Sequence, residues 1–163
     1  MTKFALRPMA PHDAAAVAAL IRAAFAAQTV ITDPPPSALR VTEPDIAAHL
    51  RRGGGAVAEM TGALIGAALW VAQDDGLYVS RLAVAPDCRR QGIAKALIAS
   101  AEGEARRAKL PVLRLSTRIA LLDNRRLFAA CGFVETTRQA HPGYAEPTFV
   151  NMEKQLSWEP GPG

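Results

Sequence analysis

One stretch of the sequence constrains the fold more than any other: residues 77–95, which read LYVSRLAVAPDCRRQGIAK. An apolar strand-like run ends at Pro86-Asp87, and a basic loop containing Gly92 follows it. Beyond Gly92 the apolar residues recur with a helical period. Free backbone N–H groups at a helix start bind anions, and a glycine lets a ligand approach the backbone closely. The stretch therefore predicts a phosphate-binding loop between a strand and a helix.

The positive charge of the chain is concentrated around this loop. Residues 81–126 carry 11 Lys or Arg and 4 Asp or Glu, a balance of +7, whereas the other residues carry 8 basic and 11 acidic side chains, a balance of −3. Arg89 and Arg90 lie inside the loop, where each offers several hydrogen-bond donors to phosphate oxygens. A basic segment is commonly just solvated surface, but its position around a helix start favours an anionic ligand.

Other classes of phosphate and nucleic-acid binding fit the sequence less well. The P-loop pattern is absent, and so are the three spaced glycines of a dinucleotide-binding turn. The 9 aromatic residues (five Phe, two Tyr and two Trp) are not interleaved with the basic residues, as stacking platforms for nucleic acid require. We therefore expect no specific nucleic-acid partner.

Length and composition indicate one globular domain. The 163 residues are 50% hydrophobic, which is enough for one core, and we predict a single domain over residues 1–156 with a flexible tail over residues 157–163. No apolar run is long enough to cross a bilayer, and the first residues lack the pattern of a signal peptide. Cys88 and Cys131 form neither a metal-binding pair nor a disulfide framework. We therefore expect a cytoplasmic protein that has no membrane partner and no metal site.

Hydrophobic periodicity predicts an alternation of strands and helices. The expected strands span residues 3–7, 56–60, 63–73, 77–85, 111–117, 133–138 and 148–155. The expected helices span residues 11–28, 43–52, 92–109 and 123–131. Short turns join the second, third and fourth strands, so these should form an antiparallel meander, and a right-handed parallel crossover should follow. The loop over residues 29–42, with its three consecutive prolines, is expected to lead over a substrate site.

Two motifs and the order of elements resemble the GNAT superfamily of acyl-CoA-dependent N-acetyltransferases. The first motif is Leu82-Ala83-Val84-Ala85-Pro86 followed by Arg89-Arg90-Gln91-Gly92-Ile93-Ala94, and the second is a helix that contains Asn124 and ends at Gly132-Phe133. The resemblance covers about residues 3–156. It implies an α/β (α+β) fold with a mixed, mostly antiparallel sheet of about seven strands, splayed between the fourth and fifth strands and flanked by about four helices.

The resemblance also implies acetyl-CoA as co-substrate. Its pantetheine arm would lie along Leu82, Ala83 and Val84, and its pyrophosphate would lie at the helix start, with Asn124 and Phe128 on the other side. The residues implied at the helix start are Arg89, Arg90, Gln91, Gly92, Ile93, Ala94 and Lys95. The acceptor would be a primary amine of a small molecule or a peptide, and many relatives are homodimers.

The implied reaction is direct attack of the amine on the thioester in a ternary complex. It needs a base that deprotonates the ammonium, a hydrogen-bond donor for the oxyanion and a group that receives the thiolate. The backbone N–H near Leu82 could supply the donor. Many family members carry a Tyr that acts as general acid four residues before the Gly-Phe pair, where this chain has Phe128. Either Tyr144, Ser116, Tyr78 or water protonates the sulfur, or the thiolate leaves unaided, since a free thiol has a pKa of roughly 8.5.

Several residues are candidates for the base, and none is singled out by the sequence. Glu59 is expected at a strand end beside the cleft, Tyr78 shares a strand face with Ser80, and His141 lies in a late loop with Tyr144. Each also has a purely structural interpretation, as a solvated charge, a packed ring or a turn residue. The candidate catalytic residues are therefore Tyr144, Glu59 and Tyr78.

An alternative function follows from Phe128. A chain without the usual acid could be a non-catalytic acyl-CoA-binding or sensing module of the same fold. Side chains that filled the amine side of the cleft would favour that alternative, and an open polar cleft would exclude it.

Overall fold

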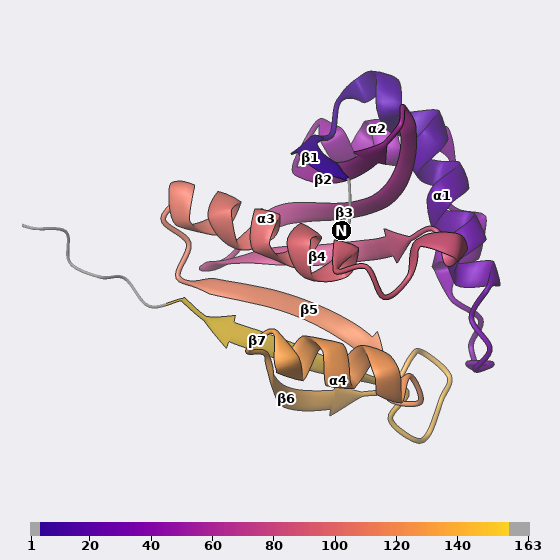
Figure 1. Ribbon diagram of the computed structural model, residues 1–163. Helices are drawn as coiled ribbons and strands as arrows, with labels where there is room; N and C mark the ends of the chain where they lie inside the picture. The colour runs from indigo at the N-terminus through magenta and orange to yellow at the C-terminus, as the bar shows by residue number, and fades with distance from the viewer. Residues whose placement is uncertain (1–3, 157–163) are drawn as a thin grey trace, which may run out of the picture.

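The computed structural model describes residues 4–156, which form a seven-stranded mixed sheet in the order β1-β2-β3-β4-β5-β7-β6 (Figure 1). The strands are β1 Ala5–Pro8, β2 Gly54–Met60, β3 Ala63–Gln73, β4 Gly76–Val84, β5 Val112–Arg118, β6 Val134–Gln139 and β7 Phe149–Gln155. The α-helices are α1 Ala14–Ala26, α2 Glu43–Leu50, α3 Ile93–Arg107 and α4 Leu122–Ala130. Short 3-10 turns lie at η1 Pro11–Asp13, η2 Ser37–Arg40 and η3 Pro86–Cys88. The tail predicted over residues 157–163 lies outside the described residues.

The predicted mixed fold is confirmed. β1 to β4 pair antiparallel in chain order, and β5 pairs parallel to β4 through the crossover helix α3. The first helix is shorter than predicted, because Asp13 holds η1 as a separate turn by accepting a hydrogen bond from the Ala10 N–H at 2.7 Å. Within residues 4–156 no helix is long and apolar enough to cross a membrane.

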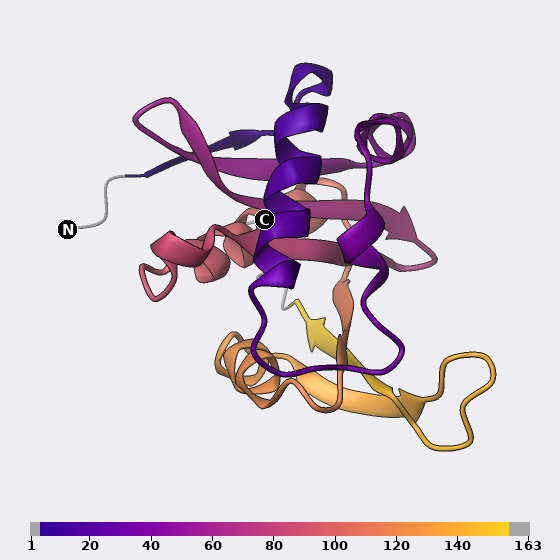
Figure 2. The same ribbon diagram turned by 90° about the vertical axis from the view of Figure 1, so that its right-hand side faces the viewer.

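Two hydrophobic cores lie on the two faces of the sheet. Side chains alternate along β2, so that Ala56 and Ala58 pack toward α3 while Val57 packs toward α1 and α2. The α3 face also receives Phe128 and Phe133 from around α4. Figure 2 shows α1 lying across the opposite face of the sheet from α3.

A β-bulge in β4 changes which side chains face which core. Leu77 and Val79 face the α3 core, but beyond the bulge Ala83 faces the α1 core. Arg81 lies at the bulge with a φ of 53°, a left-handed conformation that an Arg rarely adopts. The extra residue inverts the alternation, and Leu82 then packs against the α3 core.

The splay between β4 and β5 begins just before this bulge. Parallel pairing runs from Gly76 opposite Val112 to Tyr78 opposite Arg114 and then ends, and the two strands diverge (Figure 1). The edge of β4 beyond Tyr78 therefore faces a gap that joins the two faces of the sheet.

The α1 face is only partly covered by helices. α1 packs on β3 and β4, whereas the 27–42 segment passes beside the β5 side of the sheet (Figure 2). On β5, Leu113 and Leu115 face the α3 core, so the alternating residues Ser116 and Arg118 face the other way. Polar side chains therefore occupy this half of the sheet, and they lie near loops rather than under a helix.

Candidate functional site

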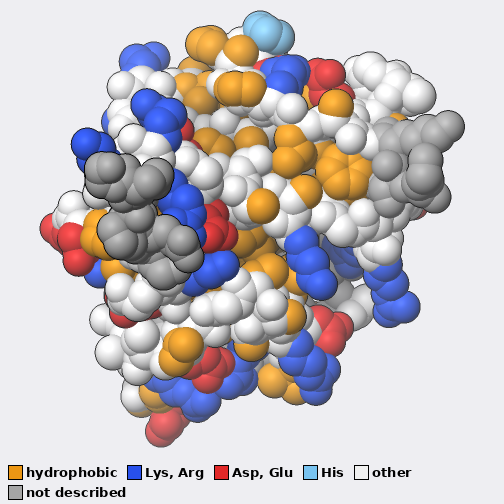
Figure 3. All heavy atoms as spheres, turned by 60° about the vertical axis from the view of Figure 1, so that its left-hand side comes forward, with side chains coloured by type: hydrophobic (Ala, Val, Ile, Leu, Met, Phe, Trp, Pro, Cys, Tyr) orange, Lys and Arg blue, Asp and Glu red, His pale blue; other side chains and the backbone are white. Residues whose placement is uncertain are grey.

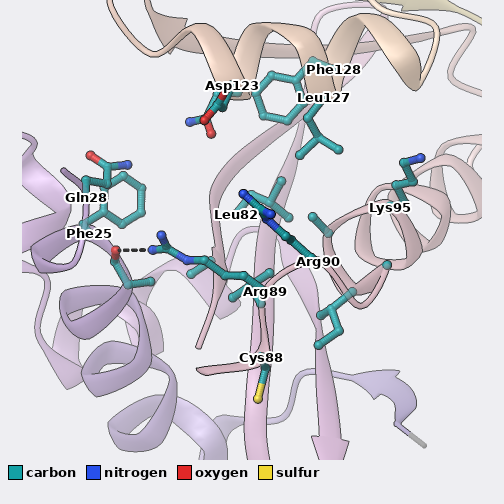
Figure 4. Close-up of a pocket in the computed structure, with 17 residues that line it drawn as sticks. Phe25, Gln28, Leu82, Cys88, Arg89, Arg90, Lys95, Asp123, Leu127 and Phe128 are labelled. Atoms are coloured by element: carbon teal, nitrogen blue, oxygen red, sulfur yellow. Dashed lines mark hydrogen bonds between the residues drawn. The ribbon is translucent and has the colours of Figure 1, made fainter. Parts of the chain in front are cut away.

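A cavity of about 560 Å³, named here the Gly92 cavity, opens at the splay beside the glycine loop (Figure 4). Three helices and the end of β4 contribute to its wall. The lining residues are Ala24, Phe25, Gln28, Leu82, Ala83, Val84, Cys88, Arg89, Arg90, Gly92, Ile93, Ala94, Lys95, Asp123, Asn124, Leu127 and Phe128. The structure thus brings together the residues predicted for coenzyme binding, apart from Gln91, which does not line the cavity.

Gly92 shapes the start of α3. It precedes Ile93 with a φ of 79°, and a Cβ built on it would meet no heavy atom within 4 Å. The N–H of Ala96 donates to the Gly92 carbonyl oxygen at 3.0 Å, so the N–H groups of residues 93–95 precede the first helical hydrogen bond. This combination of open space and free donors suits a phosphate group.

The cations of this part of the chain fall into two groups. Several of them pair with carboxylates: Arg107 with Glu104 at 2.6 Å and Arg125 with Glu135 at 2.6 Å are examples. Within residues 4–156 five others form no ion pair: Arg89, Arg90 and Lys95, which line the Gly92 cavity, and Arg81 and Arg118, which line a neighbouring cavity around Tyr78. On another part of the surface, basic and acidic side chains are interspersed (Figure 3). Ion pairs therefore do not neutralise the cations that line the Gly92 cavity and the cavity around Tyr78.

Arg89 ties the glycine loop to the first helix. Its Nη2 donates to the carbonyl oxygen of Ala24 at 3.2 Å, across the mouth of the Gly92 cavity (Figure 4). Arg90, with a φ of 64°, is exposed and has no such contact among the described residues. One arginine thus fixes the loop, and the other remains available to a ligand.

A second cavity of about 340 Å³, named the Tyr78 cavity, lies on the other side of the splay. Its lining residues are Phe25, Gln28, Pro36, Ser37, Tyr78, Val79, Ser80, Arg81, Leu82, Leu115, Ser116, Thr117, Arg118, Leu121, Asn124, Phe128, His141 and Phe149. The two cavities share five lining residues, namely Phe25, Gln28, Leu82, Asn124 and Phe128. The cavities therefore meet at the point where β4 passes α4.

Phe128 lies at this meeting point. Its side chain is 6% exposed and packs edge-on against Phe133, with ring centroids 6.1 Å apart. A phenyl ring has no proton to give, so position 128 offers apolar surface to both cavities and no acid.

A chain of hydrogen bonds leads from the Tyr78 cavity to β7 and β6. The Tyr78 hydroxyl donates to Ser116 Oγ at 3.1 Å, and Ser116 Oγ donates to Asn151 Oδ1 at 2.6 Å. The Asn151 amide nitrogen in turn donates to Thr137 and Gln139. This sequence of donors leaves a lone pair of the Tyr78 oxygen directed away from the chain, where it can accept a hydrogen bond.

Two of the three candidate catalytic residues line neither cavity. Glu59 was expected beside the cleft, but it lies on β2, two strands from β4, and accepts a hydrogen bond from Arg7 Nε at 2.7 Å. Tyr144 donates its hydroxyl proton to Asp33 Oδ1 at 2.6 Å, and this contact raises the pKa of the phenol. The expected position of Glu59 was wrong because the sequence does not show how far β2 lies from the splay.

His141 is the titratable group of the late loop that does line the Tyr78 cavity. Its Nδ1 is hydrogen-bonded to Thr148 Oγ1, and its ring packs edge-on against Phe149, with centroids 5.0 Å apart. Burial, and to a lesser extent the charge of Arg118, lowers the pKa of His141 below 6.5. The imidazole is therefore neutral at pH 7 and can accept a proton.

Several lining residues were not predicted from the sequence, among them two from the end of the predicted first helix and two strand arginines. Phe25 and Gln28 belong to the helix predicted over residues 11–28, and both border the two cavities, with Phe25 half-buried. Arg81 and Arg118 resemble any other strand arginine in the sequence. The lack of a neighbouring carboxylate partner distinguishes them only once the fold is known. No group of three or more His, Cys, Asp or Glu within residues 4–156 is arranged to hold a metal ion.

Comparison with known proteins identifies one family. The model of the acetyltransferase (GNAT) family matches residues 17–133, which is most of the chain. No curated protein sequence matches it.

Solved structures share the fold across nearly the whole chain. A GCN5-related N-acetyltransferase from Rhodopseudomonas palustris is 25% identical, with 96% of this chain and 98% of that chain covered and a TM-score of 0.77. The ribosomal-protein-S18-alanine N-acetyltransferase of Escherichia coli is 19% identical, with 96% of each chain covered and a TM-score of 0.76. The PaiA N-acetyltransferase of Thermoplasma acidophilum, solved in complex with coenzyme A, is 16% identical, with 95% of this chain and 100% of that chain covered and a TM-score of 0.77.

Proposed function

This chain belongs to the GNAT acetyltransferase family, and we propose that it transfers the acetyl group of acetyl-CoA to a primary amine held in the Tyr78 cavity. The observation that carries this proposal is the pair of cavities that meet at Leu82 and Phe128, one beside a helix start and the other lined by polar side chains. Such a pair can hold both substrates at once, which supports direct transfer in a ternary complex.

The Gly92 cavity fits acetyl-CoA. The open space at Gly92 and the N–H groups that follow it suit the pyrophosphate, and Arg90 and Lys95 add positive charge. The edge of β4 at residues 82–84 has no strand partner on the β5 side, so its backbone groups can bind an extended pantetheine arm. These groups would bring the thioester to the meeting point of the two cavities.

The reaction proposed there is acyl transfer without a covalent enzyme intermediate. The nitrogen of the neutral amine forms a bond to the acetyl carbon, the carbon–sulfur bond breaks, and its electron pair leaves on the sulfur. The attacking nitrogen becomes positively charged and then releases one N–H proton, which goes to the thiolate or to water. We assign stabilisation of the charge that develops on the carbonyl oxygen to the backbone N–H of Leu82, a residue that lines both cavities.

The ammonium proton is assigned to His141, and Tyr78 orients the amine. His141 is neutral at pH 7 and lines the Tyr78 cavity. The Tyr78 oxygen donates its proton to Ser116 and can therefore accept an N–H of the amine. Glu59 and Tyr144 are assigned no catalytic role, because neither lines a cavity.

The leaving sulfur needs no acid from position 128. A free thiol has a pKa of roughly 8.5, so a thiolate is a tolerable leaving group near neutral pH. Phe128 instead packs beside the thioester and excludes water from it. This assignment removes the main reason for a non-catalytic coenzyme-binding module. The open Tyr78 cavity, with its polar lining, also argues against that alternative.

The direct test is release of free thiol from acetyl-CoA with a broad panel of primary amines. Turnover that depends on the amine, together with acetylated product identified by mass spectrometry, is expected. Tight binding of acetyl-CoA with no turnover on any amine would contradict the proposed function.

A further inference from the structure

The charge of the Tyr78 cavity restricts what can enter it. Its lining includes Arg81 and Arg118, and none of the lining residues is an Asp or a Glu. An amine reaches an enzyme mainly as a cation, and two positive charges without a carboxylate disfavour a purely cationic acceptor. A lysine side chain or a polyamine therefore suits this cavity poorly.

The two guanidinium groups are held against one short segment of the 27–42 loop. Arg81 Nη2 donates to Ser37 Oγ at 2.9 Å, and Arg118 Nη1 donates to the carbonyl oxygen of Pro34 at 2.6 Å. Pro34 and Ser37 are three positions apart, so their Cα atoms lie within about 11 Å of each other. Each guanidinium has five N–H donors and uses one of them in these bonds, which leaves donors for a ligand.

The nearest carboxylates, Asp45 for Arg81 and Asp33 for Arg118, act on these cations only through longer-range electrostatic attraction. Asp45 is engaged with the backbone N–H of Thr42 at 2.9 Å, and Asp33 accepts the hydroxyl proton of Tyr144. Within residues 4–156 neither Arg81 nor Arg118 forms an ion pair. Burial lowers the pKa of both guanidinium groups, and the negative charges of Asp45 near Arg81 and Asp33 near Arg118 offset only part of this effect.

Building on the acetyltransferase function proposed above, we propose that the acceptor is a small amino acid-like molecule whose carboxylate is bound by Arg81 and Arg118. The planar fork of each guanidinium matches the two oxygens of a carboxylate. A cavity of about 340 Å³ lies at the small end of the range for small-molecule sites, which suits a small acceptor.

The same arrangement directs the amine to the thioester. Arg81 immediately precedes Leu82, where the two cavities meet, so a carboxylate at Arg81 leaves the amine of the same molecule near that boundary. One carboxylate cancels one of the two charges. The remaining positive charge favours the neutral form of the amine, which is the form that attacks.

Matched pairs of acceptors test the proposal. Thiol release from acetyl-CoA is measured with the L-α-amino acids, β-alanine and γ-aminobutyrate, each beside the corresponding amide. The amine of the amide has a lower pKa than the amine of the acid, so a larger fraction of it is neutral at pH 7. Amine basicity alone would therefore make the amide the better acceptor. We expect kcat/KM for at least one acid to exceed that of its amide by about 10- to 100-fold, the effect of charge-assisted hydrogen bonds.

Two variants and one control locate the preference. Arg118→Gln and Arg81→Gln should each lower kcat/KM for the preferred acid by about 10- to 100-fold while leaving its amide and the KM of acetyl-CoA unchanged. Arg138→Gln removes the same charge from an exposed position on β6 that lines neither cavity, and it should change nothing.

The proposal would be overturned if the amide were turned over as well as or better than the acid in every pair. It would also be overturned if peptide N-termini were acetylated better than all of the acids. Either result would leave the acetyltransferase function intact. If no amine is acetylated, isothermal titration in the presence of coenzyme A with N-acetyl acids and N-acetyl amides decides the question. Arg118-dependent binding of an N-acetyl acid would support the carboxylate site although the proposed function had failed, and no preference for the acids would refute the site.

Discussion

The Gly92 cavity takes most of its polar groups from one continuous segment, residues 82–95, whereas the Tyr78 cavity is assembled from parts that are distant in the chain. The first offers mainly backbone donors, a glycine and exposed cations. The second offers side chains from α1, the 27–42 loop, β4, β5, α4 and the connection before β7. A site made mainly of backbone groups can be recognised from a local sequence pattern. A site made of side chains from distant segments can be recognised only when the whole fold is known.

This difference explains why the sequence predicts one side of the site and not the other. A glycine between a strand and a helix determines local conformation wherever the chain is folded, so the residues predicted around Gly92 come together in the structure. Arg118 and Arg114 occupy alternate positions on β5, and both face the same side. Arg114 pairs with Asp75 and Glu153, whereas Arg118 reaches Pro34, 84 residues earlier in the chain.

The largest expected effect is the loss of coenzyme binding in Gly92→Glu. The substitution puts a negative side chain into open space where the phosphates are proposed to bind, and coenzyme A affinity should fall by about 1,000-fold or more. Isothermal titration with coenzyme A measures it.

Gly62→Glu is the matched control for that variant. Gly62 has a φ of 82°, close to the 79° of Gly92, and a Cβ on it also meets nothing within 4 Å, but it lines neither cavity. It should therefore suffer the same backbone strain and bind coenzyme A normally. An equal loss in both variants, or unchanged affinity in folded Gly92→Glu, would refute the phosphate site.

Substitutions of Phe128 test whether this residue, at the boundary between the cavities, mainly stabilises the fold. Phe128→Ala should lower the free energy of unfolding by about 3–5 kcal/mol, because a buried ring packed against Phe133 is lost. Chemical denaturation measures the loss, and Phe128→Leu should retain most of the stability. If Phe128→Ala keeps its stability and turnover still collapses, Phe128 acts mainly by positioning the thioester.

Substitution of His141 tests whether the Tyr78 cavity contains the base of the reaction. His141→Gln keeps a partner for Thr148 but removes the proton acceptor, so kcat should fall by about 100-fold. Because the pKa of His141 is lowered below 6.5, wild-type kcat should keep this contribution at neutral pH and lose it only as the pH falls below 6.5.

Tyr144→Phe is the control for His141, since Tyr144 lies in the same loop, with its ring centroid 6.3 Å from that of His141, and lines neither cavity. Its kcat should equal that of the wild type. If Tyr144→Phe loses activity while His141→Gln retains it, the two assignments must be exchanged.

The smallest expected effects belong to the β1 edge, far from both cavities. Two hydrogen bonds of 2.8 Å from Arg7 lower the pKa of Asp13 from 3.8 to about 2, so the ion pair should stabilise the fold by about 2 kcal/mol above pH 4. Asp13→Asn should lose this stabilisation at neutral pH. The difference from the wild type should shrink as the pH falls below 4 and disappear below about pH 2, as equilibrium unfolding at several pH values would reveal.

Glu59→Gln separates the same edge from catalysis. Its contact with Arg7 is partly exposed, so the change should cost less than about 1 kcal/mol. Unchanged kcat and KM would agree with the position of Glu59 on β2, and a large loss of kcat would restore it as a candidate base.

Periodicity alone was sufficient for most of the fold. The buried face of α3, which consists of Ile93, Leu97, Ile98, Ala101 and Ala105, is the face that the sequence predicts. The bulge at Arg81 was not predictable in this way, because no glycine or proline marks its left-handed backbone. The bulge places Arg81 in the lining of the Tyr78 cavity. The backbone feature that the sequence predicts least well therefore lies beside the cavity that it predicts least well.

A crystal structure with coenzyme A tests the central claim, that two separately built cavities meet where acetyl transfer occurs. We predict the pyrophosphate on the N–H groups of residues 92–95 and the sulfur between Leu82 and Phe128, facing the Tyr78 cavity. A coenzyme bound away from Gly92, or a sulfur that points away from the Tyr78 cavity, would contradict the claim.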